Sequence, residues 1–280
     1  MGRVERRMYK RRQKQARIRR WMLLLALVGI GVVLLVRLKS PAVLIAERLG
    51  TPSPTPFAAV YDQTVQTREV TLAAETWYAI QTGVFSTEEA ALQKAAAYAD
   101  RGAPGTVVQD GAKWRVFIAC YGSEGDAAAV RTRLGENQRV ETYLYRWECP
   151  ELRLRLTGMA GQLDVVEAGL SLMMHSAVQL RDTATLLDAS QLTAADAANT
   201  VSAIDGQMSL WAATARERFG GQVPEIVAKL VKTAEEWSVR RRALEAAASS
   251  ATELSAELKG QGMSMFQEVT RLRSSISAAP

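Results

Sequence analysis

The sequence has few of the side chains on which metal sites and nucleophilic catalysis depend. It contains one histidine, His175, and two cysteines, Cys120 and Cys149, in 280 residues. These are too few for a structural zinc site, and the sequence has neither an HExxH motif nor a grouped Ser, His and acid. Two cysteines are also too few for a disulfide framework. We therefore expect a protein that is not an enzyme and that holds no metal ion or other cofactor.

Basic residues are concentrated at the N-terminus and are followed by an uncharged stretch. Ten of the first 20 residues are Lys or Arg, and the next sixteen, WMLLLALVGIGVVLLV, carry no charge. A helix of sixteen residues spans roughly 24 Å, and Arg20, Arg37 and Lys39 can extend to both interfaces of a hydrocarbon core of about 30 Å. Because basic residues stay on the cytoplasmic side, we expect residues 1–20 to be a cytoplasmic head and residues 21–37 a single transmembrane helix, with the remainder outside the membrane.

A cleavable signal peptide is the alternative interpretation of this N-terminus, because it also combines a basic head with an apolar middle. A small-x-small cleavage motif should then follow the apolar run directly. Arg37, a leucine and Lys39 follow it instead, and only residues 40–42 loosely resemble such a motif. We therefore favour a retained anchor.

The region beyond the head is slightly acidic. The net charge of the chain is +6, to which residues 1–20 contribute +9, so the remainder carries −3. This balance gives no electrostatic reason to expect binding of DNA or RNA. Residues 51–56, TPSPTP, contain prolines that favour extended backbone, and we expect residues 38–72 to form a linker.

Residues 76–148 alternate strand and helix patterns in the order strand, helix, strand, strand, helix, strand. The first strand, TWYAIQTG at 76–83, is rich in aromatic and β-branched residues. Ser86 or Thr87 can then cap a helix that extends to Arg101, with two glutamates in its first turn.

The rest of this region completes a sheet. Segments 105–109 and 114–119 flank an Asp-Gly turn and indicate a hairpin. A second helix from Ser123 to about Glu136 leads into a last strand at 140–147. We predict an α+β fold, a four-stranded antiparallel sheet with two helices on one face in the ferredoxin- or RNP-like order βαββαβ.

Alternation along the strands predicts which side chains face the helices. Successive residues of a strand face opposite sides of the sheet. The residues expected to point toward the helices are Ile80, Thr82, Val116, Ile118, Val140 and Leu144. Those expected on the opposite face are Trp77, Gln81, Arg115, Phe117, Tyr143, Tyr145 and Trp147.

Two segments of this region, WYAIQTGVFSTEEAA and KWRVFIACYGSEGDAA, resemble the SPOR (sporulation-related repeat) domain. In that family an aromatic, Gln-containing first strand ends in Gly-x-Phe-Ser, and an aromatic-Arg-Val third strand ends in Gly-Pro-Phe. The matching residues are Gln81, Gly83, Phe85, Ser86, Trp114, Arg115 and Val116. The expected Gly-Pro-Phe appears as Ala119-Cys120-Tyr121. The resemblance covers residues 74–148, and we take residues 73–149 as a SPOR-like domain.

The resemblance implies a bacterial cell-membrane protein whose outer part binds peptidoglycan glycan strands stripped of their stem peptides, in septal cell division or in sporulation. Aromatic rings stack on the apolar faces of sugars, while Gln and Arg form hydrogen bonds to hydroxyl and amide oxygens. The predicted glycan-binding residues are Trp77, Gln81, Ser86, Trp114, Arg115, Phe117, Tyr143 and Tyr145.

Other interpretations of an aromatic sheet stay open. The aromatic residues could pack on the C-terminal helices or on another protein, since large exposed apolar patches mark interfaces. A single-strand RNA reader also stacks bases on such a sheet, but the expected location and the negative charge argue against it. The two cysteines should be free thiols, because they fall on a central strand and at the opposite edge of the sheet.

Residues 152–278 are predicted to form an α-helical bundle or coiled coil. Apolar residues recur at steps of three and four over 156–187 and 226–258, and Thr193 with Asp196 forms a capping-box pattern for a helix between them. This pattern predicts three helices.

The predicted helices contain Gly158, Gly161 and Gly169, each of which costs about 1 kcal/mol relative to Ala. Such a marginally stable region is either a spacer or self-associating stalk, or a docking surface for another envelope or division protein. The alternative to glycan binding for the whole chain is thus a membrane-anchored structural adaptor, in which the helices and the sheet surface bind other envelope proteins.

Overall fold

The computed structural model describes residues 64–248 and 250–277, which belong to one compact unit. The predicted cytoplasmic head, the predicted transmembrane helix and most of the predicted linker lie outside the described residues. Within the described part of the chain, no helix is both long enough and apolar enough to cross a membrane.

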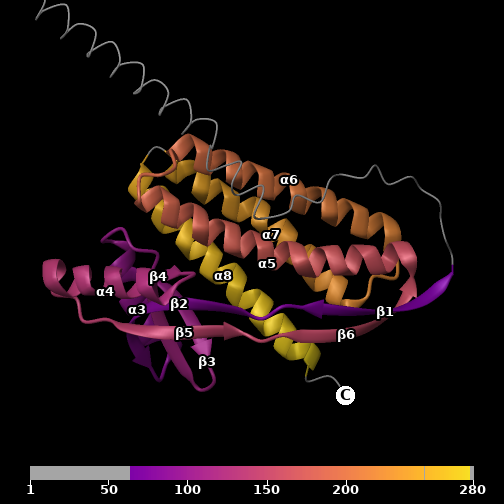
Figure 1. Cartoon of the computed structure of the whole chain (residues 1–280), viewed down its shortest axis with the longest axis horizontal. Coiled ribbons are helices and arrows are strands. Elements are labelled where there is room, and N and C mark those ends of the chain that lie inside the picture. Colours follow the sequence, from indigo (N-terminus) through magenta and orange to yellow (C-terminus); the bar gives the residue numbers. More distant parts are fainter. Residues whose placement is uncertain (1–63, 249, 278–280) are drawn as a thin grey trace, which may run out of the picture. The chain divides into compact units, whose positions relative to one another are not determined.

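A four-stranded antiparallel sheet has the strand order β3-β4-β2-β5 (Figure 1). Its strands are β2 (Glu75–Phe85), β3 (Thr106–Asp110), β4 (Lys113–Tyr121) and β5 (Tyr143–Cys149). Helix α3 (Glu88–Ala99) joins β2 to β3, and helix α4 (Glu124–Gln138) joins β4 to β5. The predicted βαββαβ order is therefore confirmed.

Local sequence explains why these elements begin where they do. The Thr87 hydroxyl accepts a hydrogen bond from the Ala90 amide and caps α3, while Ser123 caps α4 through the Asp126 amide. Gly111 has a φ of +58° in the turn between β3 and β4, a conformation that glycine adopts without a steric penalty. The Asp-Gly turn and the caps are the signals from which the sequence predicts this hairpin and these helices.

Both helices cover one face of the sheet. Ile80 and Ile118 are buried in a cluster with Ala127 of α4, and Val116 is buried in a second cluster with Ala91 of α3. The prediction that Ile80, Val116 and Ile118 point toward the helices is therefore confirmed.

Two further strands form a separate two-stranded sheet where the sequence predicts none. β1 (Val65–Leu72) pairs antiparallel with β6 (Leu152–Met159), and Leu72 is aligned with Leu152. The end of the predicted linker and the start of the predicted helical region are thus strands. Leucines and arginines alternate in β6 with a period of two, and its last leucine, Leu156, and Met159 also fit the helical spacing that continues along the chain. Pairing with β1, which is distant in the sequence, makes this segment a strand and not a helix.

Four helices, not three, follow β6. They are α5 (Ala160–Asp188), α6 (Ala194–Phe219), α7 (Glu225–Ala247) and α8 (Ala251–Ser277). The predicted capping box of Thr193 and Asp196 is present at the start of α6. The predicted helix 226–258 is interrupted after α7, where the Ser250 hydroxyl accepts a hydrogen bond from the Glu253 amide and starts α8. No glycine or proline marks this break in the sequence.

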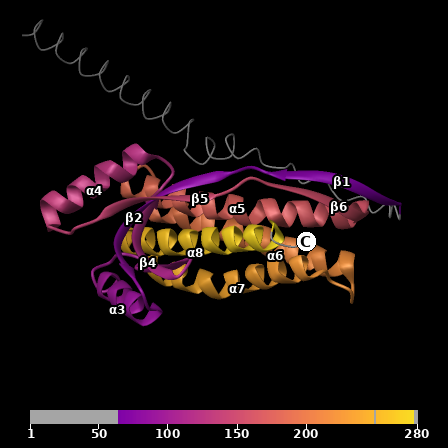
Figure 2. The same ribbon diagram turned by 90° about the horizontal axis from the view of Figure 1, so that it is seen from below.

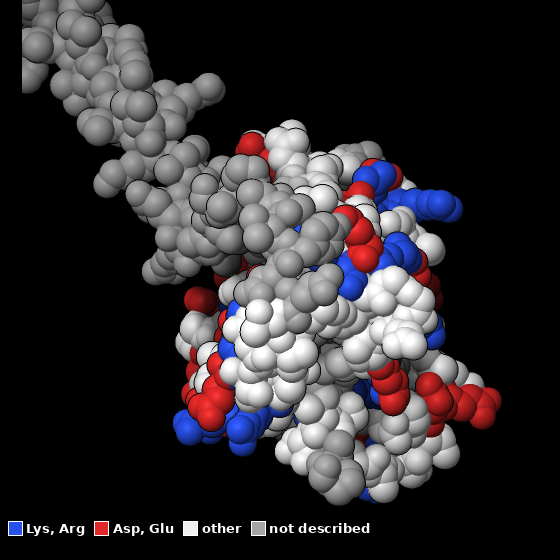
Figure 3. Space-filling view, turned by 90° about the vertical axis from the view of Figure 1, so that its right-hand side faces the viewer, with Lys and Arg blue, Asp and Glu red and all other residues white. Residues whose placement is uncertain are grey.

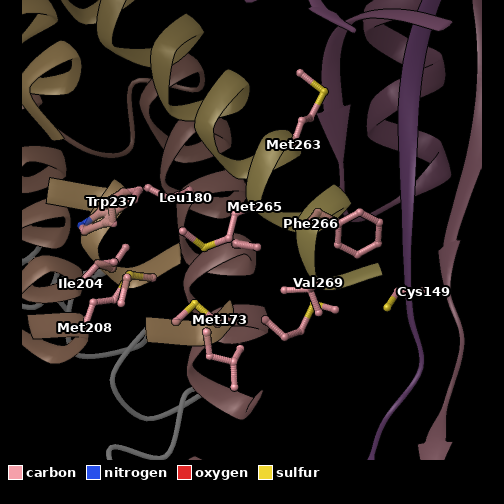
Figure 4. Close-up of a cluster of buried hydrophobic side chains, with 14 of the residues drawn as sticks. Cys149, Met173, Leu180, Ile204, Met208, Trp237, Met263, Met265, Phe266 and Val269 are labelled. Atoms are coloured by element: carbon pink, nitrogen blue, oxygen red, sulfur yellow. The ribbon is translucent and has the colours of Figure 1, made fainter. Parts of the chain in front are cut away.

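α8 and α5 pack on the sheet face opposite α3 and α4, and α6 and α7 pack on these two helices. α8 crosses this face and contacts β3, β4 and β5, and it lies beside α5 along much of its length (Figures 1 and 2). Figure 4 shows Phe266 of α8 close to the sheet and Cys149, with Met265 directed toward Leu180 and the other helices. One hydrophobic core therefore continues from the sheet into the helices.

Two helical glycines, Gly169 in this core and the exposed Gly206, give a matched test of packing. A Cβ at Gly169 in α5 would lie 2.3 Å from Cζ2 of Trp211, whose Nε1 donates to the Val165 carbonyl oxygen. A Cβ at Gly206 in α6 would meet no atom within 4 Å. The sequence predicts that each glycine destabilises its helix relative to alanine. At Gly169 this is incomplete, because the indole ring of Trp211 packs in the space that a side chain would occupy.

We expect Gly169→Ala to lower the free energy of unfolding by about 1–3 kcal/mol, because the ring must move. Gly206→Ala should raise it by about 1 kcal/mol through the helix propensity of alanine. Denaturant unfolding of both variants measures the difference. A stabilising Gly169→Ala would contradict the packing seen around Trp211.

Candidate functional site

The sheet face opposite α3 and α4 carries the predicted aromatic side chains. Trp77 is aligned with Trp147, Ala79 with Tyr145, and Gln81 with Tyr143. We call this surface the aromatic face. Its residues are Trp77, Gln81, Arg115, Phe117, Tyr143, Tyr145 and Trp147.

One part of the aromatic face is covered by α8. Trp77 and Phe117 are fully buried, and Trp147 is 6% exposed. The ring of Phe266 stacks on Trp77 with centroids 4.2 Å apart and meets Trp147 edge-on at 4.9 Å. Trp77 and Phe117, both predicted to bind glycan, are therefore core residues that no ligand reaches while α8 is in place. The alternative interpretation, packing on the C-terminal helices, describes these residues.

A buried ion-pair cluster fixes α5 to the start of β2 beside this covered part. The Arg181 guanidinium lies 4.9 Å from the centroid of the Trp77 ring and binds Glu75 at 2.9 Å and Asp182 at 2.8 Å. Burial alone would lower the pKa of Arg181, but the two carboxylates outweigh it and the pKa is raised. Trp77 Nε1 also donates to Glu75.

The other part of the aromatic face is open, and five residues form it. We call it the open end; its residues are Gln81, Asp110, Arg115, Tyr143 and Tyr145. The Arg115 guanidinium donates to Gln81 Oε1 at 2.8 Å and to Asp110 Oδ2 at 2.7 Å. It also lies 4.5 Å from the centroid of the Tyr145 ring. Arg115 is thus held in one orientation, which lowers the entropy that it would lose on binding a ligand.

The backbone of β2 directs the Gln81 side chain toward Arg115. The register between β2 and β4 shifts on both sides of Gln81, as at β-bulges. A bulge bends the strand locally and redirects a side chain. Gln81 is only 8% exposed, with its carbonyl oxygen bound to Arg115, so it supports the cluster from beneath.

The two tyrosines of the open end differ in exposure. Tyr143 is 54% exposed and its hydroxyl donates to Glu141. Tyr145 is half-buried, stacks on Phe117 with centroids 5.4 Å apart, and donates to Asp110. Burial, followed by the negative charge of Asp110, raises the pKa of Tyr145, so the phenol stays neutral and can donate a hydrogen bond.

Ser86 and Trp114, also predicted to bind glycan, do not lie on the aromatic face. Ser86 is exposed between β2 and α3, and the neighbouring Thr87 caps the helix instead. Trp114 is aligned with Phe85 and Gln109 and packs on the α3 side of the sheet. The predicted set is therefore divided between the core, the open end and the opposite face.

Sequence analysis missed Asp110 and Val84 as members of this surface. Asp110 accepts hydrogen bonds from both Arg115 and Tyr145. Val84 is 44% exposed and is aligned with Arg115, which places its side chain on the same face. The hairpin register could have identified Asp110, because two-residue alternation from Arg115 across the Asp-Gly turn places it there.

The cysteines and the histidine form no reactive site. Cys120 and Cys149 are both free and buried, as the sequence predicts. Burial raises the pKa of Cys120 to about 12 and also raises that of Cys149, so neither thiol is readily ionised. His175 is exposed on α5. Among residues 64–248 and 250–277, no group of three or more His, Cys, Asp or Glu side chains is placed to hold a metal ion.

Comparison with protein families gives one match. Residues 74–146 match the family model described as SPOR domain, in agreement with the resemblance of the two sequence segments. No curated protein and no solved structure was found to match the chain.

Proposed function

Because residues 74–146 form a SPOR domain, a peptidoglycan-binding domain associated with cell division, we propose that this protein binds peptidoglycan glycan strands stripped of stem peptides through the open end of its aromatic face. SPOR domains bind without catalysing a reaction, so we propose a binding protein and not an enzyme. The anchor that we propose for residues 21–37 would hold the domain outside the bacterial cell membrane at division septa or at sites of wall remodelling in sporulation.

The observation that carries this proposal is the fixed Arg115 beside the ring of Tyr145. Arg115 is held by Gln81 and Asp110 and has the Tyr145 ring beside it, while Tyr143 exposes more than half of its surface. An aromatic ring offers a flat apolar surface to a sugar ring. The guanidinium and the phenol donate hydrogen bonds to hydroxyl and N-acetyl oxygens.

Charge argues against a nucleic acid as the ligand. The net charge beyond the N-terminal head is −3. On the surface shown in Figure 3, Lys and Arg side chains lie near Asp and Glu side chains and do not form a separate basic stripe. A phosphate backbone would require such a stripe, whereas a sugar does not.

One reason for the adaptor alternative is that the apolar seams of the helices could require a protein partner, and the packing within the chain weakens this reason. The predicted helical seams do not need a second protein to bury them, since Leu163, Leu170, Met208 and Leu230 are each at most 3% exposed within one chain. A protein partner would have to bind the outer surfaces of the helices instead.

Co-sedimentation of the full-length chain in detergent with cell-wall sacculi tests the glycan proposal. We expect more binding to sacculi stripped of stem peptides by an amidase than to intact sacculi. Arg115→Ala should weaken binding about tenfold or more, since a hydrogen bond to a charged group contributes about 1.5–3 kcal/mol. Tyr143→Ala should also weaken it, because the exposed ring is lost.

The matched control is Arg153→Ala, since Arg153 is an arginine on β6 whose side chain is 80% exposed. It should bind as the wild type does. Equal binding of wild type and Arg115→Ala, with both shown to be folded by circular dichroism, would refute the proposal. The full chain is required, because a fragment of the sheet alone would expose Trp77 and Trp147 and could adsorb non-specifically.

A further inference from the structure

A groove of about 530 Å³ lies between α3, β3 and α8, on the other side of the β3–β4 hairpin from the open end. The residues that line it and carry the argument are Leu92, Gln109, Trp114, Gln261, Ser264 and Gln267. We propose that this groove is a second glycan-binding site, built jointly by the SPOR domain and α8. The inference rests on the proposed function, because it takes the ligand to be the same polymer.

The register of the hairpin separates the two surfaces. Gln109 is aligned with Trp114, and the adjacent residues Asp110 and Arg115 belong to the open end. Because neighbouring residues of a strand face opposite sides, Gln109 and Trp114 point away from the open end. Substitutions in one surface therefore leave the side chains of the other in place.

Trp114 supplies an aromatic wall. It is half-buried, packs on the cluster that contains Val116 and Ala91, and lines the groove together with Leu92, which is 53% exposed. An indole held by packing on one side offers its remaining surface to a ligand without losing rotamer freedom. This arrangement suits stacking against a sugar ring.

Three polar side chains of α8, Gln261, Ser264 and Gln267, line the same groove as Trp114. Gln267 Nε2 is buried and has no hydrogen-bond partner among the described residues. Native proteins leave few buried polar atoms unpaired, and those that remain need an explanation. Gln261 donates to Glu257 at 2.6 Å, which holds its amide in place. Gln267 as a whole is only partly buried and lines the groove, so a rotation of its amide can bring Nε2 to a ligand whose hydroxyl and N-acetyl oxygens supply the acceptor that it lacks.

The charge of the groove suits a stripped glycan. Glu88 and Glu257 line it, and Arg271 is the only basic residue among its lining residues. Two acids and one base disfavour a phosphate polymer. When an amidase removes a stem peptide, it leaves a lactyl carboxylate on the sugar, and Arg271 can pair with that single charge.

The groove exists only because α8 approaches the sheet closely. A Cβ at Gly260 would lie 3.2 Å from Cβ of Pro104, just before β3. The helix that covers Trp77 and Phe117 thus contributes Gln261, Ser264 and Gln267 to a different glycan surface.

Fluorine NMR of the full-length chain labelled with 5-fluorotryptophan tests the inference, because the chain has six tryptophans and Trp114→Leu identifies the Trp114 signal. The probe is a peptide-free glycan fragment of defined length, released from amidase-treated sacculi by partial muramidase digestion. We expect the Trp114 signal to shift saturably with this fragment and to stay in place with dextran. The shift should persist in the Arg115→Ala/Tyr143→Ala double variant.

Gln267→Met separates binding from folding. It removes the unpaired donor while keeping the length of the side chain, so the melting temperature should be unchanged or higher. The glycan affinity reported by the Trp114 signal should fall tenfold or more. Gln93→Met, on the exposed surface of α3 outside the groove, is the matched control and should titrate as the wild type does.

Two results would overturn the inference while leaving the proposed function intact. In the first, the wild type co-sediments with stripped sacculi, but its Trp114 signal does not shift with the glycan fragment or shifts only with free stem peptide. In the other, Gln267→Met titrates as the wild type does. If the wild type neither sediments with stripped sacculi nor shows a Trp114 shift, both proposals fail.

Discussion

Replacing Phe266 by alanine is expected to lower the free energy of unfolding by about 3–5 kcal/mol, the usual cost of truncating a buried phenylalanine. Phe266 is fully buried and stacks on Trp77 while meeting Trp147 edge-on. Its loss leaves a cavity between α8 and the sheet, which the two rigid indoles cannot fill. Denaturant unfolding measures the effect through the transition midpoint.

The same experiment tests whether the sheet and the helices unfold together. Because one core contains both, circular dichroism in the far ultraviolet and tryptophan fluorescence should report one coincident transition. Leu210→Ala is the control, since Leu210 is 70% exposed on α6 and should change stability by less than about 0.5 kcal/mol. Two separate transitions, or an effect of Phe266→Ala as small as that of Leu210→Ala, would contradict the shared core.

Arg181→Met is expected to lower the free energy of unfolding by about 1–3 kcal/mol, because the charge-assisted hydrogen bonds of the buried guanidinium to two carboxylates that are themselves partly solvated are lost. The Arg181 side chain is 7% exposed and binds Glu75, whose side chain is 29% exposed. The substitution also removes the cation beside the Trp77 ring. Unfolding by denaturant at neutral pH measures the loss.

A double variant isolates the electrostatic part of this effect. In Arg181→Met/Glu75→Gln the Arg181–Glu75 pair is absent and only Asp182, whose side chain is 51% exposed, is left without its partner, so part of the lost stability should return. Arg153→Met removes an arginine that is 80% exposed and paired with Glu151, and it should change stability by no more than about 1 kcal/mol. If the double variant were no more stable than Arg181→Met, packing and not charge would explain the loss.

Short-range signals account for the part of the fold that the sequence predicts correctly. Thr87 and Ser123 cap the two helices of the SPOR domain, and Gly111 adopts the positive φ of the hairpin turn. Each signal depends on neighbours within a few residues, and the SPOR pattern adds their order along the chain. The free state of both cysteines follows from the same strand order.

The two-stranded sheet of β1 and β6 shows where such signals fail. The alternating leucines and arginines of β6 permit a strand, but neither β6 nor β1 can be assigned until each has a partner far away in the sequence. The break between α7 and α8 was likewise missed, since it contains no glycine or proline and depends on how the two helices pack.

The sequence by itself determined the βαββαβ sheet and most of the residues on its aromatic face, though not Asp110 or Val84, because strand alternation and capping act locally. Only the tertiary structure decided which of those residues a ligand can reach. Trp77 and Phe117 are buried because α8, from the far end of the chain, lies over them, whereas Tyr143 is 54% exposed and the Arg115 side chain is 22% exposed. Burial of aromatic surface by a distant helix leaves no trace in the local pattern, since a ring that stacks on another side chain and one that stacks on a sugar occupy the same strand positions.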